Sequence, residues 1–264
     1  MLFGLVGSEM CIRDSLKGSA VVLRKVETTI LNMESLNLPP VMYSIVDMHK
    51  GLVLVTGPTG SGKSTTLASI INQINETRQA NIITIEDPVE FIHKDKKSII
   101  SHREVGKQTE SFSTALKSAL REDPDVILVG ELRDIETIGM ALTAAETGHL
   151  VFGTLHTSGA PNTINRIIDV FPSEQQAQIQ AQLADSLKMV ITQKLFKTKD
   201  GKGRVGAFEI MVCNSPVKNL IREKKIHQIP SVMQTGTRDG MMSMEKSVEN
   251  LVQSGKISSV VAKS

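Results

Sequence analysis

The residues best suited to chemistry in this 264-residue sequence form one short run. The run reads Gly57, Pro58, Thr59, Gly60, Ser61, Gly62, Lys63, Ser64 and then Thr65, and it fits the pattern G-x-x-x-x-G-K-[ST]. Glycines let successive backbone N–H groups approach an anion without Cβ clashes. Lys63 can reach the β- and γ-phosphates of a nucleotide, and the Ser64 hydroxyl can ligate Mg²⁺. The run therefore predicts a phosphate-binding loop.

The segments on both sides of the loop support this prediction. Residues 52–55 are all apolar and predict a buried strand of a parallel sheet. After the loop, apolar residues recur with the spacing i, i+3, i+4 and i+7, which predicts one face of an amphipathic helix; they are Leu67, Ile70, Ile71 and Ile74. A strand, a glycine-rich loop and a helix are the context that the pattern requires. The alternative, a chance match in an ordinary turn, does not explain this order.

Carboxylates follow a second apolar segment, residues 82–85. Glu86, Asp87 and Glu90 lie just past the carboxyl end of this predicted strand, the edge at which ligands bind in open α/β sheets. Carboxylates there can hold Mg²⁺ or orient an attacking water. We predict a catalytic role for Glu86 and a metal-ligating role for Asp87. A solvated acidic turn is the alternative.

Two further predicted strands, 126–129 and 150–155, also end in polar residues. The first ends in Gly130 and Glu131, and Gly130 stands where many phosphate-loop ATPases carry a metal-ligating Asp. Glu131 is thus predicted to be the base that polarises water rather than a direct metal ligand. The second strand leads to His156, which could detect the γ-phosphate through a hydrogen bond or could be structural.

The remaining pattern predicts an α/β fold with a mostly parallel sheet. Helices are expected at 111–121 and 135–145, a strand at 204–212, and short helices from Ser215 onward. Apolar residues also follow one helical stripe, which predicts a helix that continues to Leu195; they are Ile179, Leu183, Leu187, Val190, Ile191 and Leu195. The basic stretch 91–106 is expected to be a solvated face.

Composition excludes several classes of protein. The formal net charge is +2, with seven Phe, one Tyr and no Trp, which argues against a nucleic-acid partner. The two cysteines, Cys11 and Cys213, form neither a disulfide framework nor a structural zinc site, and they fit a reducing cytosol. Residues 1–15 resemble nothing that follows, and we interpret them as non-native, adapter-like sequence; a genuine N-terminus is the alternative.

Four segments in this order resemble the secretion ATPase superfamily, and within it the PilT-type ATPases of type IV pilus retraction (twitching motility). They are GPTGSGKSTT, TIEDPVEF, REDPDVILVGELRD and TAAETGHLVFGTLHT. The resemblance covers about residues 18–252 and implies a RecA-like P-loop ATPase core assembled as a homo-hexamer. It implies a remnant of a largely missing PAS-like N-terminal domain at 16–49, a core at 50–213 and a C-terminal helical subdomain at 214–264.

The resemblance also implies roles for single residues. Glu86, Asp87 and Glu90 fall in the family's Asp box, Glu131 on its Walker B acid and His156 in its His box. Arg121 matches an arginine that the family places near phosphate, and Arg103 is a weaker candidate. The sequence departs from the family's C-terminal signature at Lys218, where the family has Arg, and that exchange is not neutral at a bidentate site.

The resemblance implies an ATP-hydrolysing, Mg²⁺-dependent motor for pilus retraction. Such a motor is cytoplasmic and peripheral at the inner membrane, where it meets the platform protein of the pilus. The alternative is a pilus-assembly or type II secretion ATPase, but those commonly carry a four-cysteine zinc module, and the C-terminal part here has Cys213 alone. A non-hydrolysing scaffold and a RecA-type nucleic-acid translocase are the other classes considered.

Overall fold

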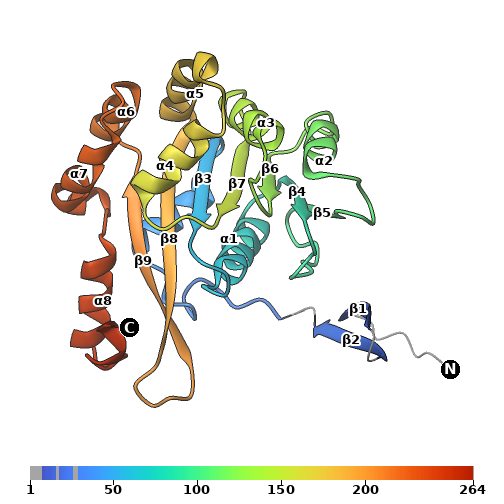
Figure 1. Ribbon diagram of the computed structural model, residues 1–264, viewed down its shortest axis with the longest axis horizontal. Helices are drawn as coiled ribbons and strands as arrows, with labels where there is room; N and C mark the ends of the chain where they lie inside the picture. The colour runs from blue at the N-terminus through green and yellow to red at the C-terminus, as the bar shows by residue number, and fades with distance from the viewer. Residues whose placement is uncertain (1–7, 16–17, 26–28, 264) are drawn as a thin grey trace.

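The computed structural model describes residues 8–15, 18–25 and 29–263, and its centre is a seven-stranded sheet (Figure 1). The strands, in chain order, are β3 (Gly51–Thr56), β4 (Asn81–Glu86), β5 (Ile99–Glu104), β6 (Val126–Val129), β7 (Leu150–Leu155), β8 (Leu187–Lys197) and β9 (Arg204–Val212). Their order across the sheet is β5-β4-β6-β7-β3-β8-β9, and β9 alone among these seven runs antiparallel to its neighbour. The predicted α/β class with a mostly parallel sheet is confirmed.

Helices cover both faces of this sheet. They are α1 (Lys63–Thr77), α2 (Phe112–Ala119), α3 (Ile135–Glu146), α4 (Ala160–Asp169), α5 (Ser173–Ser186), α6 (Ser215–Arg222), α7 (Ile229–Thr235), α8 (Met244–Gln253) and the 3₁₀ helices η1 (Pro40–Asp47), η2 (Ile226–Gln228), η3 (Gly236–Asp239) and η4 (Val261–Lys263). No helix in the described part of the chain is long and apolar enough to cross a membrane.

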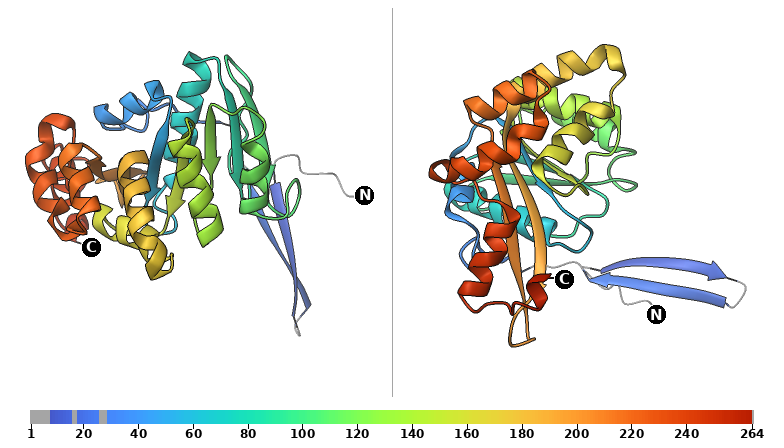
Figure 2. Two further views of the ribbon diagram at one scale, coloured as in Figure 1. Left: turned by 90° about the horizontal axis from the view of Figure 1, so that it is seen from above. Right: turned by 60° about the vertical axis from the view of Figure 1, so that its left-hand side comes forward.

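The hydrophobic core has two parts, because successive side chains of the central strands point to opposite faces of the sheet. Val53 and Val55 of β3 pack into a cluster with α1 and η1, whereas Leu52 and Leu54 pack into a cluster with α2 to α6 (Figure 2). Because successive side chains of a strand point to opposite faces, a strand covered on both sides is apolar throughout. This is why the central strands appear in the sequence as uninterrupted apolar runs.

The prediction of a helix that continues to Leu195 is wrong from Leu187 onward, where the chain forms a strand. The helix α5 ends at Ser186, and Leu187 already begins β8, which runs parallel to β3. Val190 and Ile191 are adjacent and both buried, since each faces a different helical layer. A strand that is buried on both faces does not alternate between apolar and polar residues. Some of its apolar residues can therefore fall at the spacing expected for a helix.

The interpretation of 91–106 as a solvated face holds for Lys94, Lys96 and Lys97, which are exposed, but it is wrong for the histidines of this segment. The segment contains the edge strand β5; His93 is buried beside it, and His102, within it, is partly buried. Their rings stack with centroids 5.7 Å apart, and His102 Nδ1 lies 2.8 Å from Thr84 Oγ1. The histidines thus fill space beside β4 rather than facing water.

The short helices predicted from Ser215 onward are confirmed, and they lie along β9 (Figure 1). The Phe208 N–H donates to Ser247 Oγ at 2.9 Å, and Ile210 and Met242 exchange backbone hydrogen bonds of 2.8 and 3.0 Å. The C-terminal helices are therefore attached to the edge strand of the sheet.

The first described residues of the chain form a two-stranded hairpin. Its strands, β1 (Ser8–Ser15) and β2 (Gly18–Lys25), pair antiparallel and form a sheet separate from the seven-stranded one. Residues 1–7 of the stretch interpreted as non-native lie outside the described residues. The domain division at 16–49, 50–213 and 214–264 stays a prediction.

Candidate nucleotide-binding site

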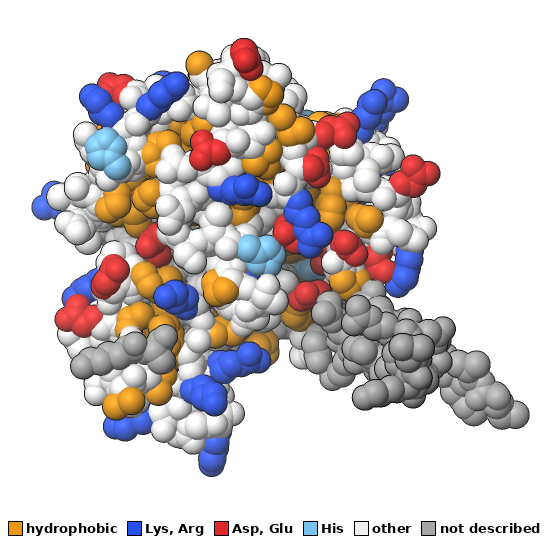
Figure 3. Space-filling view, in the orientation of Figure 1, with side chains coloured by type: hydrophobic (Ala, Val, Ile, Leu, Met, Phe, Trp, Pro, Cys, Tyr) orange, Lys and Arg blue, Asp and Glu red, His pale blue; other side chains and the backbone are white. Residues whose placement is uncertain are grey.

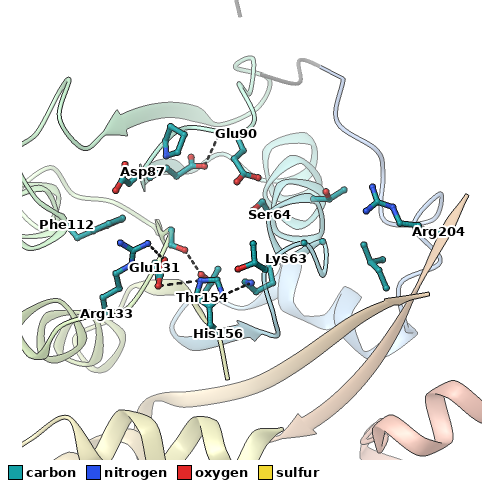
Figure 4. A pocket seen from close by; sticks show the side chains of 18 residues that line it. Lys63, Ser64, Asp87, Glu90, Phe112, Glu131, Arg133, Thr154, His156 and Arg204 are labelled. Atoms are coloured by element: carbon teal, nitrogen blue, oxygen red, sulfur yellow. Dashed lines mark hydrogen bonds and ion pairs between the residues drawn. The ribbon is translucent and has the colours of Figure 1, made fainter. Parts of the chain in front are cut away.

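The predicted site residues meet at the carboxyl ends of β3, β4, β6 and β7. A cavity of about 370 Å³ opens there, as expected for an open parallel sheet (Figure 4). The predicted residues that line it are Thr59, Gly60, Gly62, Lys63, Ser64, Thr65, Glu86, Asp87, Glu131 and His156. Gly57, Pro58 and Ser61 shape the loop at its edge.

The loop 57–62 has the geometry of an anion cradle. Gly57 has a φ of +133°, and a Cβ there would lie 2.4 Å from the Gln193 carbonyl oxygen, so the position requires glycine. The helix α1 begins directly after Gly62, and no side chain caps its first N–H groups. Ser61 Oγ is buried and has no hydrogen-bond partner among the described residues. Uncapped N–H groups and an unpaired hydroxyl fit a bound phosphate.

Lys63 points back across the loop. Its Nζ donates to the Gly57 and Pro58 carbonyl oxygens at 2.9 and 3.2 Å and lies 3.5 Å from His156 Nδ1. Burial lowers the pKa of Lys63, and the nearby carboxylates of Glu131 and Glu90 partly oppose this shift. A positive group with little solvent around it acts strongly on a phosphate.

Glu131 lies between two nitrogen-bearing side chains (Figure 4). Its Oε2 is 2.6 Å from a guanidinium nitrogen of Arg133, and its Oε1 is 3.5 Å from His156 Nε2. The pKa of Glu131 is lowered, first by the hydrogen bond from Arg133. The backbone before Glu131 is fixed to β4, because Gly130 N–H donates to the Ile85 carbonyl oxygen at 2.7 Å.

Glu86 is the most buried carboxylate of the cavity wall. Its side chain is 13% exposed, and its Oε1 lies 3.9 Å from His102 Nδ1. Burial raises the pKa of Glu86 to about 7. At neutral pH this group is therefore partly protonated, whereas Glu131 is ionised, so the two acids of the site differ in charge.

The raised pKa of Glu86 predicts how stability changes with pH. Between pH 4.5 and 7 the folded protein binds a proton at Glu86 that the unfolded chain has released. The stability contributed by this group is thus complete below pH 4.5 and lost as pH rises through 7. As pH rises, the free energy of unfolding should decrease more in the parent than in Glu86→Gln. The two decreases should differ by at most roughly 3 kcal/mol. Urea unfolding of both proteins from pH 5 to 8 measures the difference, and parallel curves would contradict it.

The predicted arginines lie elsewhere in the chain. Arg121 is exposed in the turn after α2 and does not line the cavity. Arg103 is paired with Glu122, the residue after Arg121, at 2.6 Å. Within one subunit the structure therefore does not bring Arg121 to the phosphate loop, and its predicted role stays a prediction for a neighbouring subunit.

The cavity is also lined by residues that were not predicted for the site, and three of them bring a charge or an aromatic ring to it. Arg133 follows Glu131 by two positions, a spacing that could have identified it, because both lie on the turn after β6. Phe112 begins α2, and Arg204 begins β9 and reaches the cavity from the opposite side (Figure 4). Nothing in the local sequence of Arg204 indicates this position.

A mostly parallel sheet with a glycine-rich loop between β3 and α1, and with an acid at the tip of β6, defines a RecA-like P-loop nucleoside triphosphatase core. The family model for "Type II/IV secretion system protein" matches residues 9–259. The chain belongs to this family.

Relatives within the family match most of the chain. It is 57% identical to the "Twitching motility protein" of Neisseria gonorrhoeae over 94% of its length, and 53% identical to the "Type IV pilus retractation ATPase PilT" of Pseudomonas aeruginosa over 92%. It spans 66% and 70% of the lengths of these two relatives. A crystal structure of the pilus retraction motor PilT with bound ADP superposes with a TM-score of 0.91 at 47% identity, covering 98% of this chain and 75% of that one.

Proposed function

We propose that this chain hydrolyses ATP to power type IV pilus retraction, as one subunit of a homo-hexameric motor. The observation that carries this proposal is the convergence of Lys63, Glu131 and His156 on one cavity beside a phosphate loop. The names of the relatives at 57% and 53% identity supply the cellular process. The motor would act in the cytoplasm, at the inner-membrane platform protein of the pilus.

The site residues divide the work of phosphoryl transfer. Backbone N–H groups of the loop and Lys63 bind the β- and γ-phosphates. Glu131 accepts a proton from the attacking water, and His156 bridges Glu131 and Lys63 so that both respond to the γ-phosphate. Ser64 and Asp87 line the same cavity and would hold Mg²⁺, which when bound would neutralise charge on the phosphates.

The alternative functions have less support. The pilus-assembly ATPase of Myxococcus xanthus is 42% identical over 62% of this chain, below the values for the twitching relatives. A non-hydrolysing scaffold would not need Glu131 in the cavity. Figure 3 shows basic and acidic side chains interspersed on the face that it presents, which does not favour a nucleic-acid track.

The proposal is tested in two stages. Purified protein should release phosphate from ATP in a Mg²⁺-dependent manner, and expression of the protein should restore twitching to a strain that lacks its retraction motor. Absence of hydrolysis would contradict the enzymatic proposal. Hydrolysis without restored twitching would contradict the assignment to retraction and leave the ATPase assignment in place.

A further inference from the structure

In this structure the guanidinium of Arg133 forms an ion pair with the carboxylate of Glu131, the predicted catalytic base. Its guanidinium lies 2.6 Å from Glu131 Oε2, while His156 faces the other oxygen at 3.5 Å (Figure 4). Both carboxylate oxygens thus face a donor-bearing side chain. Arg133 also lines the cavity with Lys63 and feels the charge of Asp87. The Arg133 guanidinium therefore lies in the same cavity as Glu131 and the phosphate loop.

The backbone of Arg133 is anchored on both sides, whereas its side chain is not. Leu132 N–H donates to the Thr154 carbonyl oxygen at 3.0 Å, and the Asp134 carboxylate accepts the Thr137 N–H at 2.8 Å and caps α3. The Arg133 side chain is 61% exposed. Its guanidinium can therefore turn about a fixed backbone without disturbing the core.

The pairing conflicts with the work expected of Glu131. A carboxylate that accepts a charge-assisted hydrogen bond is a weaker base, and Arg133 is the leading cause of the lowered pKa of Glu131. A terminal phosphate carries more negative charge than one carboxylate and matches the guanidinium fork equally well. A phosphate in the loop beside Lys63 therefore competes with Glu131 for Arg133.

We propose that Arg133 is a further catalytic residue, which exchanges between the Glu131 carboxylate and the γ-phosphate of the nucleotide bound by its own subunit. This inference rests on the proposed ATPase function. On the phosphate, Arg133 stabilises the charge of the transition state, and Glu131 Oε2 becomes available to the attacking water. On Glu131, the same side chain keeps the base from acting before the γ-phosphate is in place.

Nucleotide binding tests the exchange without any turnover. Arg133→Gln should weaken binding of a non-hydrolysable ATP analogue by about tenfold and leave ADP binding unchanged, because ADP lacks the γ-phosphate. Titration calorimetry of both nucleotides measures the two affinities. Equal weakening for both nucleotides, or weakening for neither, would overturn the proposal, since a merely structural role does not distinguish them.

Kinetics test the second half of the proposal. Arg133→Gln should lower kcat by about 10²-fold or more, and Arg133→Lys should recover part of the loss. In the nucleotide-free variant, Glu131 has lost Arg133 and keeps His156 and Lys63, so its pKa should rise and the acidic limb of the kcat/KM profile should move to higher pH. The acidic limb of the kcat profile should stay in place, because in the ATP complex Arg133 has already left Glu131. An unchanged kcat, or two limbs that move together, would contradict the exchange.

The controls separate this inference from the proposed function. Arg238→Gln removes an exposed arginine of η3 and should leave both affinities and rates at parent values. Thermal melting of each variant reports folding. A parent protein that binds ATP without releasing phosphate would contradict the proposed function, whereas a hydrolysing parent with an unaffected Arg133→Gln variant would contradict the inference alone.

Discussion

ATP turnover by the Lys63→Ala variant should fall to background. The Nζ of Lys63 is held against the loop by the Gly57 and Pro58 carbonyl oxygens, in position to meet the transferring phosphoryl group. Among the described residues, it is the one lysine that lines the cavity. No neighbouring lysine can therefore replace its charge in the transition state, where preorganised cations have their largest effect. Phosphate release at saturating ATP measures the loss.

Folding should survive this change. Burial of the ammonium group is unfavourable for the charged form of Lys63, so removal of the side chain should alter the free energy of unfolding by about 1 kcal/mol or less. Lys246→Ala, at an exposed position of α8 paired with Glu249, is the matched control and should keep the parent rate. A folded Lys63→Ala protein that hydrolyses ATP at the parent rate would show that the phosphate-loop assignment is wrong.

Glu131→Gln should bind ATP as the parent does and hydrolyse it about 10²- to 10⁴-fold more slowly. The amide keeps the shape of the carboxylate and can still contact Arg133 and His156, but it cannot accept a proton from water. Single-turnover hydrolysis of bound ATP, together with a separate measurement of affinity, distinguishes binding from chemistry.

The same experiment decides between the two roles considered for Glu131. If affinity falls while the bound ATP turns over at the parent rate, Glu131 ligates the metal and is not the base. Glu136→Gln, in the exposed first turn of α3 and outside the cavity lining, provides a control for the loss of one carboxylate. It should change neither affinity nor rate.

The sequence predicts the parts of the fold in which local pattern and chemistry coincide. The strands β3, β4, β6 and β7 are short apolar runs that end in glycine, acid or histidine, so each strand and its functional residue can be found together. The phosphate loop is similarly self-contained. Because parallel strands share a carboxyl edge, the convergence of these residues follows from the predicted sheet.

The parts that sequence reasoning misses depend on long-range packing. No glycine or proline separates α5 from β8, and β8 is buried on both faces, so neither a break nor an alternation marks the change of structure. Arg204 reaches the cavity because β8 and β9 form a hairpin. Asp200 and Gly201 mark its turn, but β8 was predicted as a helix, so the pairing of the two strands could not be recognised. The burial of His93 and His102 likewise requires β5 to pair with β4.

The strand β8 touches the phosphate loop on one side and carries the C-terminal helices on the other. Gln193 accepts a hydrogen bond from Thr66 at 2.8 Å and its carbonyl oxygen borders Gly57, while β9, hydrogen-bonded along β8, bears α8. A mechanical load on those helices is thus applied to a strand that forms one wall of the cradle. Energetic coupling between two sites is reciprocal. If phosphate binding tilts β8 and so moves the C-terminal helices, then a load on those helices must change the affinity for phosphate. For the motor proposed above, tension on the C-terminal helices would then change the affinity for the nucleotide.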